Sequence, residues 1–153
     1  MAKTTTCPIT QTLQTFGQTF VAADSFVAAN EGTAPTNTKI VFTAGEEGSV
    51  IKSLMIATDD TSAGVYNFYI SMDSGTTKYL LFAIAVAATS GFASGTTVNV
   101  DVLGNTYVAG LPMDQSGKFV LPMKAGAILY AAKQTSAVTA SKTTHIVGIA
   151  EDY

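Results

Sequence analysis

From Thr38 onward, short apolar runs end at clusters of glycine, aspartate, serine and threonine. They predict about eight strands of four to nine residues, with a turn signal roughly every 8–12 residues, as in a sandwich or barrel. The runs are KIVFTA, SVIKSLMIAT, VYNFYISM, KYLLFAIAVA, TVNVDVLGN, KFVLPMKAGAILYAAKQ and THIVGIAED. Pro122 and Gly126 divide the sixth run into a short strand and a longer one. We therefore expect an all-β, antiparallel fold in one domain.

The first four runs are predicted to form two antiparallel hairpins. KIVFTA and SVIKSLMIAT are joined by the turn Gly45-Glu46-Glu47-Gly48, and VYNFYISM and KYLLFAIAVA by DSGTT. Alternate residues of a strand point to opposite faces. In VYNFYISM the apolar set, expected to face the core, is Tyr66, Phe68, Ile70 and Met72. In TVNVDVLGN the residues that share one face are Val98, Val100 and Val102.

Residues 1–36 differ from the rest of the chain and are rich in threonine, glutamine and alanine. Their apolar residues recur with a helical spacing of four, three and four: Ile9, Leu13, Phe16 and Phe20. The β-branched threonines and Gly17 weaken a helix. The favoured interpretation is an extended arm that lays its aromatic side chains on the domain or on a neighbouring subunit. The expected division is an arm over residues 1–36 and a β-sandwich over residues 37–153.

Charge is sparse, at 12% of residues with a net charge of −3, and arginine is absent. Arginine is the residue best suited to bidentate phosphate and base contacts. The eight lysines are scattered singly: Lys3, Lys39, Lys52, Lys78, Lys118, Lys124, Lys133 and Lys142. Without a basic cluster, the sequence argues against a nucleic-acid partner. A neutral, hydroxyl-rich surface suits a protein that packs against neighbours.

No segment has the pattern of a membrane span or a secretion signal. The longest apolar run, YLLFAIAVAA, has ten residues, and a spanning helix needs about 20. We expect it to form a strand that is buried on both faces. MAKTTTCPITQTLQ lacks the apolar stretch of a signal peptide, so synthesis in a host cytoplasm, without a membrane partner, is expected.

Adjacent carboxylates occur twice, and neither pair predicts catalysis. Glu46 and Glu47 occupy a turn between glycines, where both side chains would be solvated, whereas paired-carboxylate chemistry needs two groups that converge on one bond. Asp59 and Asp60 in DDTSAG, and Asp73 in MDSGTT, lack the alternating oxygen ligands of a calcium loop. Turn chemistry, in which aspartate bonds to nearby backbone N–H groups, explains them better.

The single histidine and single cysteine have no partners that would predict chemistry. His145 lies in the last predicted strand without further ligands at metal-binding spacing. Cys7 has no second cysteine with which to form an internal disulfide. GLPMDQSGKF has six residues between its glycines, where a phosphate-binding loop has four. We therefore expect no enzyme, and no catalytic, cofactor-binding or metal-binding residue.

Four stretches carry a resemblance to a known family. NEGTAPTNTKIVFTAGEEGSVIKSLMIAT contains a strand ending in F-T-A-G, a short turn with G-S and an apolar strand, and TSAGVYNFYIS follows it. FVLPMKAGAILYAAKQ contains an L-P-x-x-A-G element, and IVGIAEDY ends the chain. This series resembles small virion proteins of tailed bacteriophages, of the capsid decoration (cement) type. The chain departs from the family pattern in its longer middle, residues 89–117.

The resemblance implies a jelly-roll-like β-sandwich that decorates and stabilises a phage head from the virion surface. It implies the major capsid protein as partner, and further copies of the chain, as a trimer more often than a dimer. The N-terminal arm would reach a neighbouring subunit. Two alternatives stay open: a glycan-binding module, which the absence of tryptophan disfavours, and another virion component of the tail, neck or fibre.

Overall fold

The computed structural model describes residues 12–28, 35–91, 99–104 and 110–153. All the regular elements within these ranges are strands. They are β1 (Thr12–Val21), β2 (Lys39–Thr43), β3 (Ser49–Thr58), β4 (Gly64–Ser71), β5 (Tyr79–Val86), β6 (Val100–Asp101), β7 (Leu121–Met123), β8 (Ile128–Lys133) and β9 (Thr143–Asp152). Within this part of the chain there is no helix long and apolar enough to cross a membrane.

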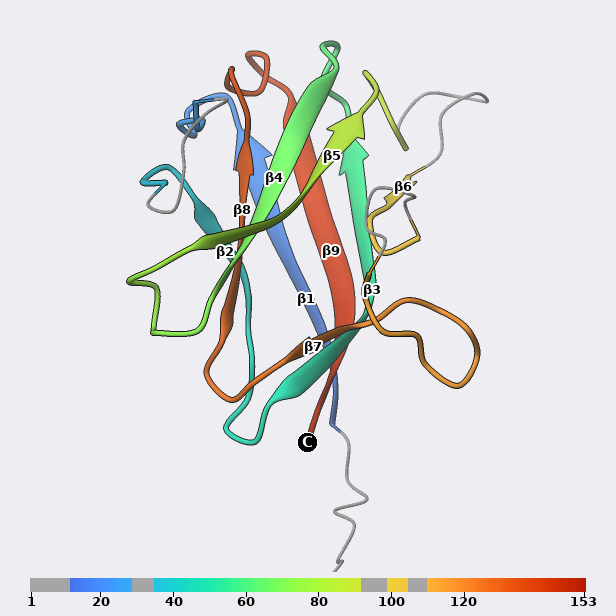
Figure 1. Cartoon of the computed structure of the whole chain (residues 1–153). Helices are drawn as coiled ribbons and strands as arrows, with labels where there is room; N and C mark the ends of the chain where they lie inside the picture. Colours follow the sequence, from blue (N-terminus) through green and yellow to red (C-terminus); the bar gives the residue numbers. More distant parts are fainter. Residues whose placement is uncertain (1–11, 29–34, 92–98, 105–109) are drawn as a thin grey trace, which may run out of the picture.

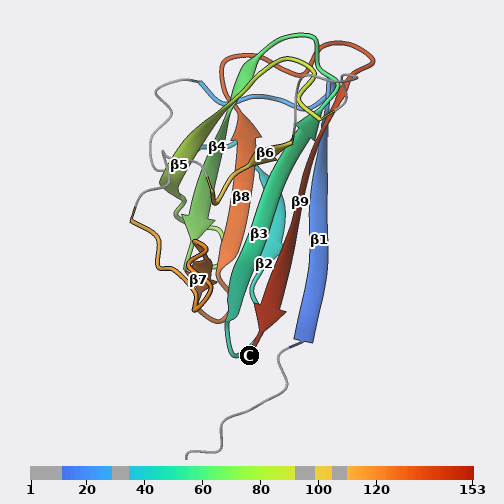
Figure 2. The ribbon, with the colours of Figure 1, turned by 90° about the vertical axis from the view of Figure 1, so that its right-hand side faces the viewer.

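The strands form two antiparallel sheets that face each other (Figure 1; Figure 2). One sheet has the order β1-β9-β3-β6, with β7 also pairing with β3, and the other has the order β2-β8-β4-β5. The pairs are nested: β1 with β9, β2 with β8, β3 with β6 and β7, and β4 with β5. Strands pair in this nested way when one long hairpin is rolled into a sandwich, which is the jelly-roll arrangement. The predicted all-β, jelly-roll-like sandwich is therefore confirmed.

Of the two predicted hairpins, only the second is confirmed. β4 pairs with β5 from Gly64↔Val86 to Ile70↔Tyr79. The first prediction is wrong, because β2 and β3 belong to different sheets and the turn between them crosses from one sheet to the other. β3 pairs instead with β9, along its whole length from Ser49↔Asp152 to Thr58↔Thr144. The five-residue β2 could not supply so long a ladder.

Part of the expected N-terminal arm is a strand of the sandwich. β1 pairs with β9 from Thr12↔Asp152 to Val21↔Thr143, so the sandwich begins before residue 37. The helical alternative is wrong for these residues, because a period of two also places Phe16 and Phe20 on one face. Phe16 packs against the Phe42 ring at 4.6 Å, and Phe20 is 1% exposed. Residues 1–11 of the expected arm lie outside the described ranges.

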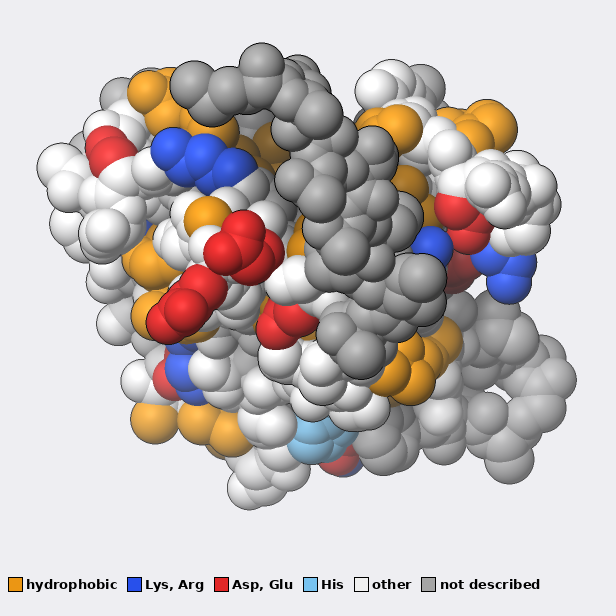
Figure 3. Space-filling view, turned by 90° about the horizontal axis from the view of Figure 1, so that it is seen from below, with side chains coloured by type: hydrophobic (Ala, Val, Ile, Leu, Met, Phe, Trp, Pro, Cys, Tyr) orange, Lys and Arg blue, Asp and Glu red, His pale blue; other side chains and the backbone are white. Residues whose placement is uncertain are grey.

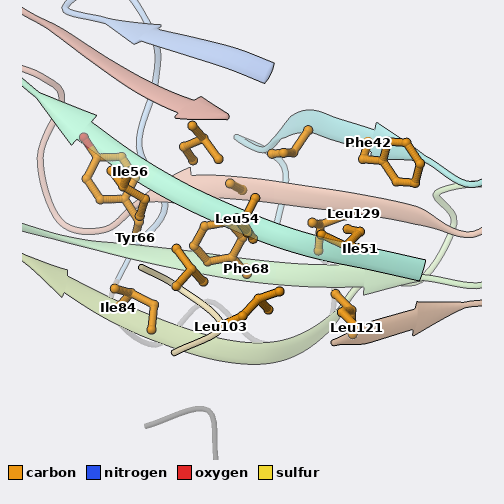
Figure 4. Packing of buried hydrophobic residues seen from close by; sticks show 14 of the residues in the cluster. Phe42, Ile51, Leu54, Ile56, Tyr66, Phe68, Ile84, Leu103, Leu121 and Leu129 are labelled. Carbon is orange, nitrogen blue, oxygen red and sulfur yellow. The ribbon is translucent and has the colours of Figure 1, made fainter. Parts of the chain in front are cut away.

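Large apolar side chains from both sheets fill the interior (Figure 4). The labelled residues are Phe42, Ile51, Leu54, Ile56, Tyr66, Phe68, Ile84, Leu103, Leu121 and Leu129. In β4 the predicted inward face is confirmed for Tyr66 and Phe68, and Ile70 lies partly buried against the same cluster. Met72 follows the end of the strand and is exposed, contrary to the prediction. The core therefore forms between the two layers from strand faces of period two.

Two further sequence predictions concern the second half of the chain. Val102 is buried in the core and Val100 is half-buried against it, whereas Val98 lies outside the described ranges. The tight connection between a short and a longer strand is confirmed. It joins β7 to β8, and the Ala127 N–H closes it by donating to the Lys124 carbonyl at 3.0 Å. Gly126 occupies the left-handed region there, at φ 67°.

The outer face of β4 and β8 is covered by the chain around Val27. The Val27 N–H donates to the Lys133 carbonyl at 3.0 Å, and the Thr135 N–H donates to the Val27 carbonyl at 2.9 Å. Val27 forms a second buried cluster with Tyr69 and Tyr130. This layer explains why β4 is buried on both faces although it lies in an antiparallel sheet.

By contrast, β5 is buried on one face only, so the prediction of a strand buried on both faces is wrong. Phe82, Ile84 and Val86 point into the core, whereas Leu80 is 55% exposed and Leu81 is 36% exposed. The reason is that the chain around Val27 packs on Tyr69 of β4 and Tyr130 of β8, whereas β5 lies beyond β4 at the edge of the sheet. Apolar composition alone does not distinguish such an edge strand from a central one.

Candidate functional site

The adjacent glutamates lie in the connection between the two sheets. Glu46 and Glu47 are both exposed, in a turn that the Gly48 N–H closes by donating to the Gly45 carbonyl at 3.1 Å. This connection is not the tip of the predicted hairpin. The two side chains face solvent in one short turn, which does not provide two carboxylates that converge on a substrate bond.

His145 lies on the outer face of β9 and contacts hydroxyl groups. Its Nδ1 atom lies 3.0 Å from Thr19 Oγ1 on β1, and its Nε2 atom lies 3.3 Å from Thr143 Oγ1. Within the described ranges, no three His, Cys, Asp or Glu residues are grouped so that they could hold a metal ion. Cys7 lies outside these ranges. The contacts of His145 join two strands of the same sheet.

Asp60 is a structural residue that sequence reasoning placed in a simple turn. Its carboxylate accepts a hydrogen bond from Lys133 Nζ at 2.7 Å, and the two side chains are only 2% and 3% exposed. Thr139 Oγ1 and the Ser62 N–H also donate to it. Burial alone would raise the pKa of Asp60, but the hydrogen bonds from Lys133, Thr139 and Ser62 outweigh it and lower the pKa to about 2. This buried ion pair fastens the end of β8 to the connection between β3 and β4.

The neighbouring Asp59 and Tyr66 extend the same polar cluster. Asp59 accepts a hydrogen bond from the Thr143 N–H at 2.6 Å, at the start of β9. The Tyr66 hydroxyl donates to Thr144 Oγ1 at 2.6 Å, and burial raises the pKa of Tyr66 to about 12. Each polar group has a partner from another strand or connection. The cluster therefore stabilises one end of the sandwich.

Asp73 shows the turn chemistry that was predicted for it. Its Oδ1 atom accepts hydrogen bonds from the Thr77 N–H at 2.9 Å and from Ser71 Oγ at 2.7 Å. The Gly75 N–H donates in turn to Ser71 Oγ at 2.8 Å. These hydrogen bonds, above all that from the Thr77 backbone, lower the pKa of Asp73 to about 2. The β4–β5 connection is thereby held by its own side chains.

The outer face of the β1-β9-β3 sheet is the best candidate for a functional surface. Its outward side chains Leu13, Val147 and Ile149 are 64%, 37% and 37% exposed. The register places Val147 opposite Met55 on β3 and Ile149 opposite Thr15 on β1. We call these five residues the outer sheet face. A contiguous apolar surface on a folded protein is typical of a contact with another macromolecule.

Charges border the outer sheet face and are paired with one another. At one end Lys52 Nζ lies 3.4 Å from Glu151 Oε2, and at the other Lys142 Nζ lies 3.9 Å from Asp59 Oδ2. Figure 3 shows the end of the sandwich from below, where charged side chains form small groups among neutral and apolar surface. A neutral centre with a polar rim is the usual anatomy of a protein interface.

Sequence reasoning expected a neutral contact surface but did not locate it. The signal was present in THIVGIAED, where both alternating sets of side chains have apolar residues at their centre. Ile146 and Ala150 fill the core, which leaves Val147 and Ile149 to face outward. A strand with one exposed face normally alternates apolar residues that face the core with polar residues that face outward, so apolar residues on the outward face mark a surface that is suited to contact.

The fold assignment rests on the strand pairing and not on comparisons with known proteins. No family model matches the chain, and no curated protein matches it. Among solved structures it is similar to a chain of the cyanophage Pam1 capsid asymmetric unit, with a TM-score of 0.45 and 9% identity over 94% of this chain and 86% of that chain. It is also similar to a structure of infectious bursal disease virus, Gt strain, with a TM-score of 0.33 and 18% identity over 90% of this chain and 32% of that chain.

Proposed function

We propose that this protein is a structural component of a bacteriophage particle that binds the capsid surface and stabilises the shell. It would contact the major capsid protein and further copies of itself. The observation that carries this proposal is the outer sheet face, a neutral apolar surface on a rigid jelly roll. Jelly rolls serve in viral capsids as well as in lectins, and the resemblance in sequence to phage decoration proteins favours the capsid.

The physical basis for such a role is contact area between rigid surfaces. The centre of the outer sheet face would bury Val147 and Ile149 without removing any charge from water, and desolvation of charged groups is a main cost of association. The ion pair between Lys52 and Glu151 stays at the rim, where it can remain hydrated. A rigid sheet that bridges two shell subunits would resist their separation under internal pressure.

The test is binding to capsids of the encoding phage that lack this protein. Purified protein is mixed with these capsids and with free coat subunits, and both mixtures are sedimented. We expect saturable binding to the capsids, little binding to free subunits, and a higher temperature of shell disruption. Protein that remains in the supernatant with capsids would overturn the proposal, and saturable binding to a glycan array in its place would favour the glycan-binding alternative.

A pair of variants links this binding to the outer sheet face. Val147→Lys places a charge at its centre, and Ile40→Lys places the same charge on another exposed apolar residue, on β2 in the opposite sheet. We expect Val147→Lys to weaken capsid binding at least about tenfold, because an unpaired charge would be desolvated. Ile40→Lys should bind like the parent protein. Equal binding by the two variants would contradict the assignment of this surface.

A further inference from the structure

β5 is an edge strand whose outer backbone is open. It pairs with β4 on one side, and within the described ranges it has no strand on the other side. Figure 2 shows it at the margin of the molecule. An edge strand leaves alternate N–H and C=O groups without ladder partners, so it is a ready template for a strand of another chain.

The other edge strands have features that discourage pairing with a strand of another chain, and β5 lacks these features. β6 has two residues, β7 has three including Pro122, and β2 has five and begins at Lys39. Along β1, Lys39 Nζ donates to the Thr19 carbonyl at 2.8 Å, and Gln18 Nε2 donates to the Ile40 carbonyl at 3.0 Å. β5 has eight residues without charge, proline or glycine. Its one irregularity, between Leu80 and Phe82, leaves Phe82–Val86 regular.

Exposed apolar side chains gather at the start of the same strand. Tyr79, Leu80 and Leu81 are 47%, 55% and 36% exposed, and Met72, at the end of β4, is 49% exposed. This end of the hairpin projects from the body of the sandwich (Figure 1). Here an apolar surface and an open backbone edge coincide.

The charged residues next to this surface already have partners. Lys78 Nζ donates to the Pro35 carbonyl at 2.9 Å and lies 4.9 Å from the centre of the Tyr130 ring. Asp73 is held by Thr77 and Ser71. β5 therefore offers no free charge that would select a partner of opposite sign.

A second copy of the chain fits this edge because the edge is self-complementary. Antiparallel pairing about a two-fold axis matches each open donor with an acceptor of the same strand in the other copy. Such pairing also sets residues near the centre of the strand opposite their own copies, so a charge there would meet a like charge. The protomer carries a net charge of −3, and the uncharged β5 is a place where two copies can approach without like charges meeting.

The contact area fits a weak dimer. Eight residues at about 3.4 Å each give a strand of roughly 27 Å, and one sheet layer about 10 Å thick gives about 270 Å² per protomer. The total of roughly 550 Å² lies in the range of weak, transient association. We therefore expect dissociation in the upper micromolar range.

We propose that β5 of one copy pairs antiparallel with β5 of a second copy, joining the two β2-β8-β4-β5 sheets into one continuous sheet. This deepens the homo-oligomer of the proposed function and rests on it, but not on the capsid. An isologous contact of this kind gives a dimer, and the trimer implied by the sequence resemblance would need a different contact.

The test is sedimentation of the free full-length protein, without capsids, at concentrations from about 1 to 300 µM, which spans micromolar dissociation constants. We expect a reversible monomer–dimer equilibrium. Ala83→Lys, at an exposed site in the middle of β5, should weaken it at least about tenfold, because two lysines would meet near the axis. The matched control Met113→Lys, at an exposed apolar residue in the connection before β7, should dimerise like the parent. A monomer throughout, a trimer, or unchanged dimerisation of Ala83→Lys would overturn the proposal.

Hydrogen exchange of the parent protein tests the same contact without a variant. The open amides of β5 should exchange more slowly at high protein concentration than at low concentration, while the amides of β1 should not change. Exchange in β5 that is independent of concentration would overturn the proposal. Because no capsid is present, this outcome is distinguishable from failure of the capsid-binding experiment.

Discussion

The replacement Lys133→Met is expected to reveal how much of the stability depends on the buried ion pair. Methionine keeps an unbranched apolar side chain but leaves the Asp60 carboxylate buried without its cation. Removing one partner of a buried pair costs about 3–5 kcal/mol. Thr139 and Ser62 still donate to Asp60, so we expect a loss near the lower end, about 3 kcal/mol of unfolding free energy at pH 7.

The pH dependence of the parent protein gives a second measure of the same pair. The pKa of Asp60 is about 2 in the folded chain, below its ordinary value of 3.8. A lowered pKa stabilises the fold above about pH 4, and this contribution is lost as the pH falls toward 2. A difference of about two pH units corresponds to roughly 2–3 kcal/mol. In Lys133→Met the carboxyl should take up its proton at higher pH, so the gap between the two proteins should narrow in acid.

The assay is urea denaturation followed by circular dichroism, at pH 7 and at steps down to pH 2. Lys118→Met is the control, because Lys118 is exposed and its replacement should change the unfolding free energy by less than about 0.5 kcal/mol. If Lys133→Met were as stable as Lys118→Met at pH 7, the ion pair would not hold this end of the sandwich, and the reasoning would be refuted.

Two further replacements and one titration test other parts of the fold. Tyr66→Phe removes the hydroxyl that donates to Thr144 and should cost about 1 kcal/mol in denaturant unfolding; an unchanged midpoint would contradict this. In Gly148→Ala the new Cβ would collide with Phe16 Cζ and lie 2.6 Å from the Ser53 carbonyl oxygen, and this overpacking should cost about 1–3 kcal/mol, seen as a lower melting temperature. Asp73 should titrate by NMR near pH 2, with its stabilising effect present above about pH 4 and lost toward pH 2; a midpoint near 4 would refute its hydrogen bonding.

The strand positions were predictable because the period of two is a local signal. Tyr66 and Phe68 alternate with Asn67 in the sequence, and both aromatic rings lie in the core. Strand partners were not predictable in the same way, because pairing is decided by competition between segments far apart. β3 takes β9 and not β2, and nothing within KIVFTAGEEGSVIKSLMIAT contains that information.

Two local patterns fit more than one structure. Phe16 and Phe20 lie four residues apart, which places them on one face of a helix and also on one face of a strand. The ion pair between Asp60 and Lys133 joins residues 73 positions apart, so a local reading of DDTSAG could only suggest a turn. For the candidate site, the sequence predicted a neutral surface through its low charge, and it needed the strand register to bring Val147 and Met55 together.

An electron-microscopy map of the phage particle that contains this protein tests the central claim most directly. The account predicts density for the β-sandwich on the outer surface of the capsid, with Val147 and Ile149 against the shell. Density for the sandwich in the tail, neck or fibre, and none on the capsid, would contradict it.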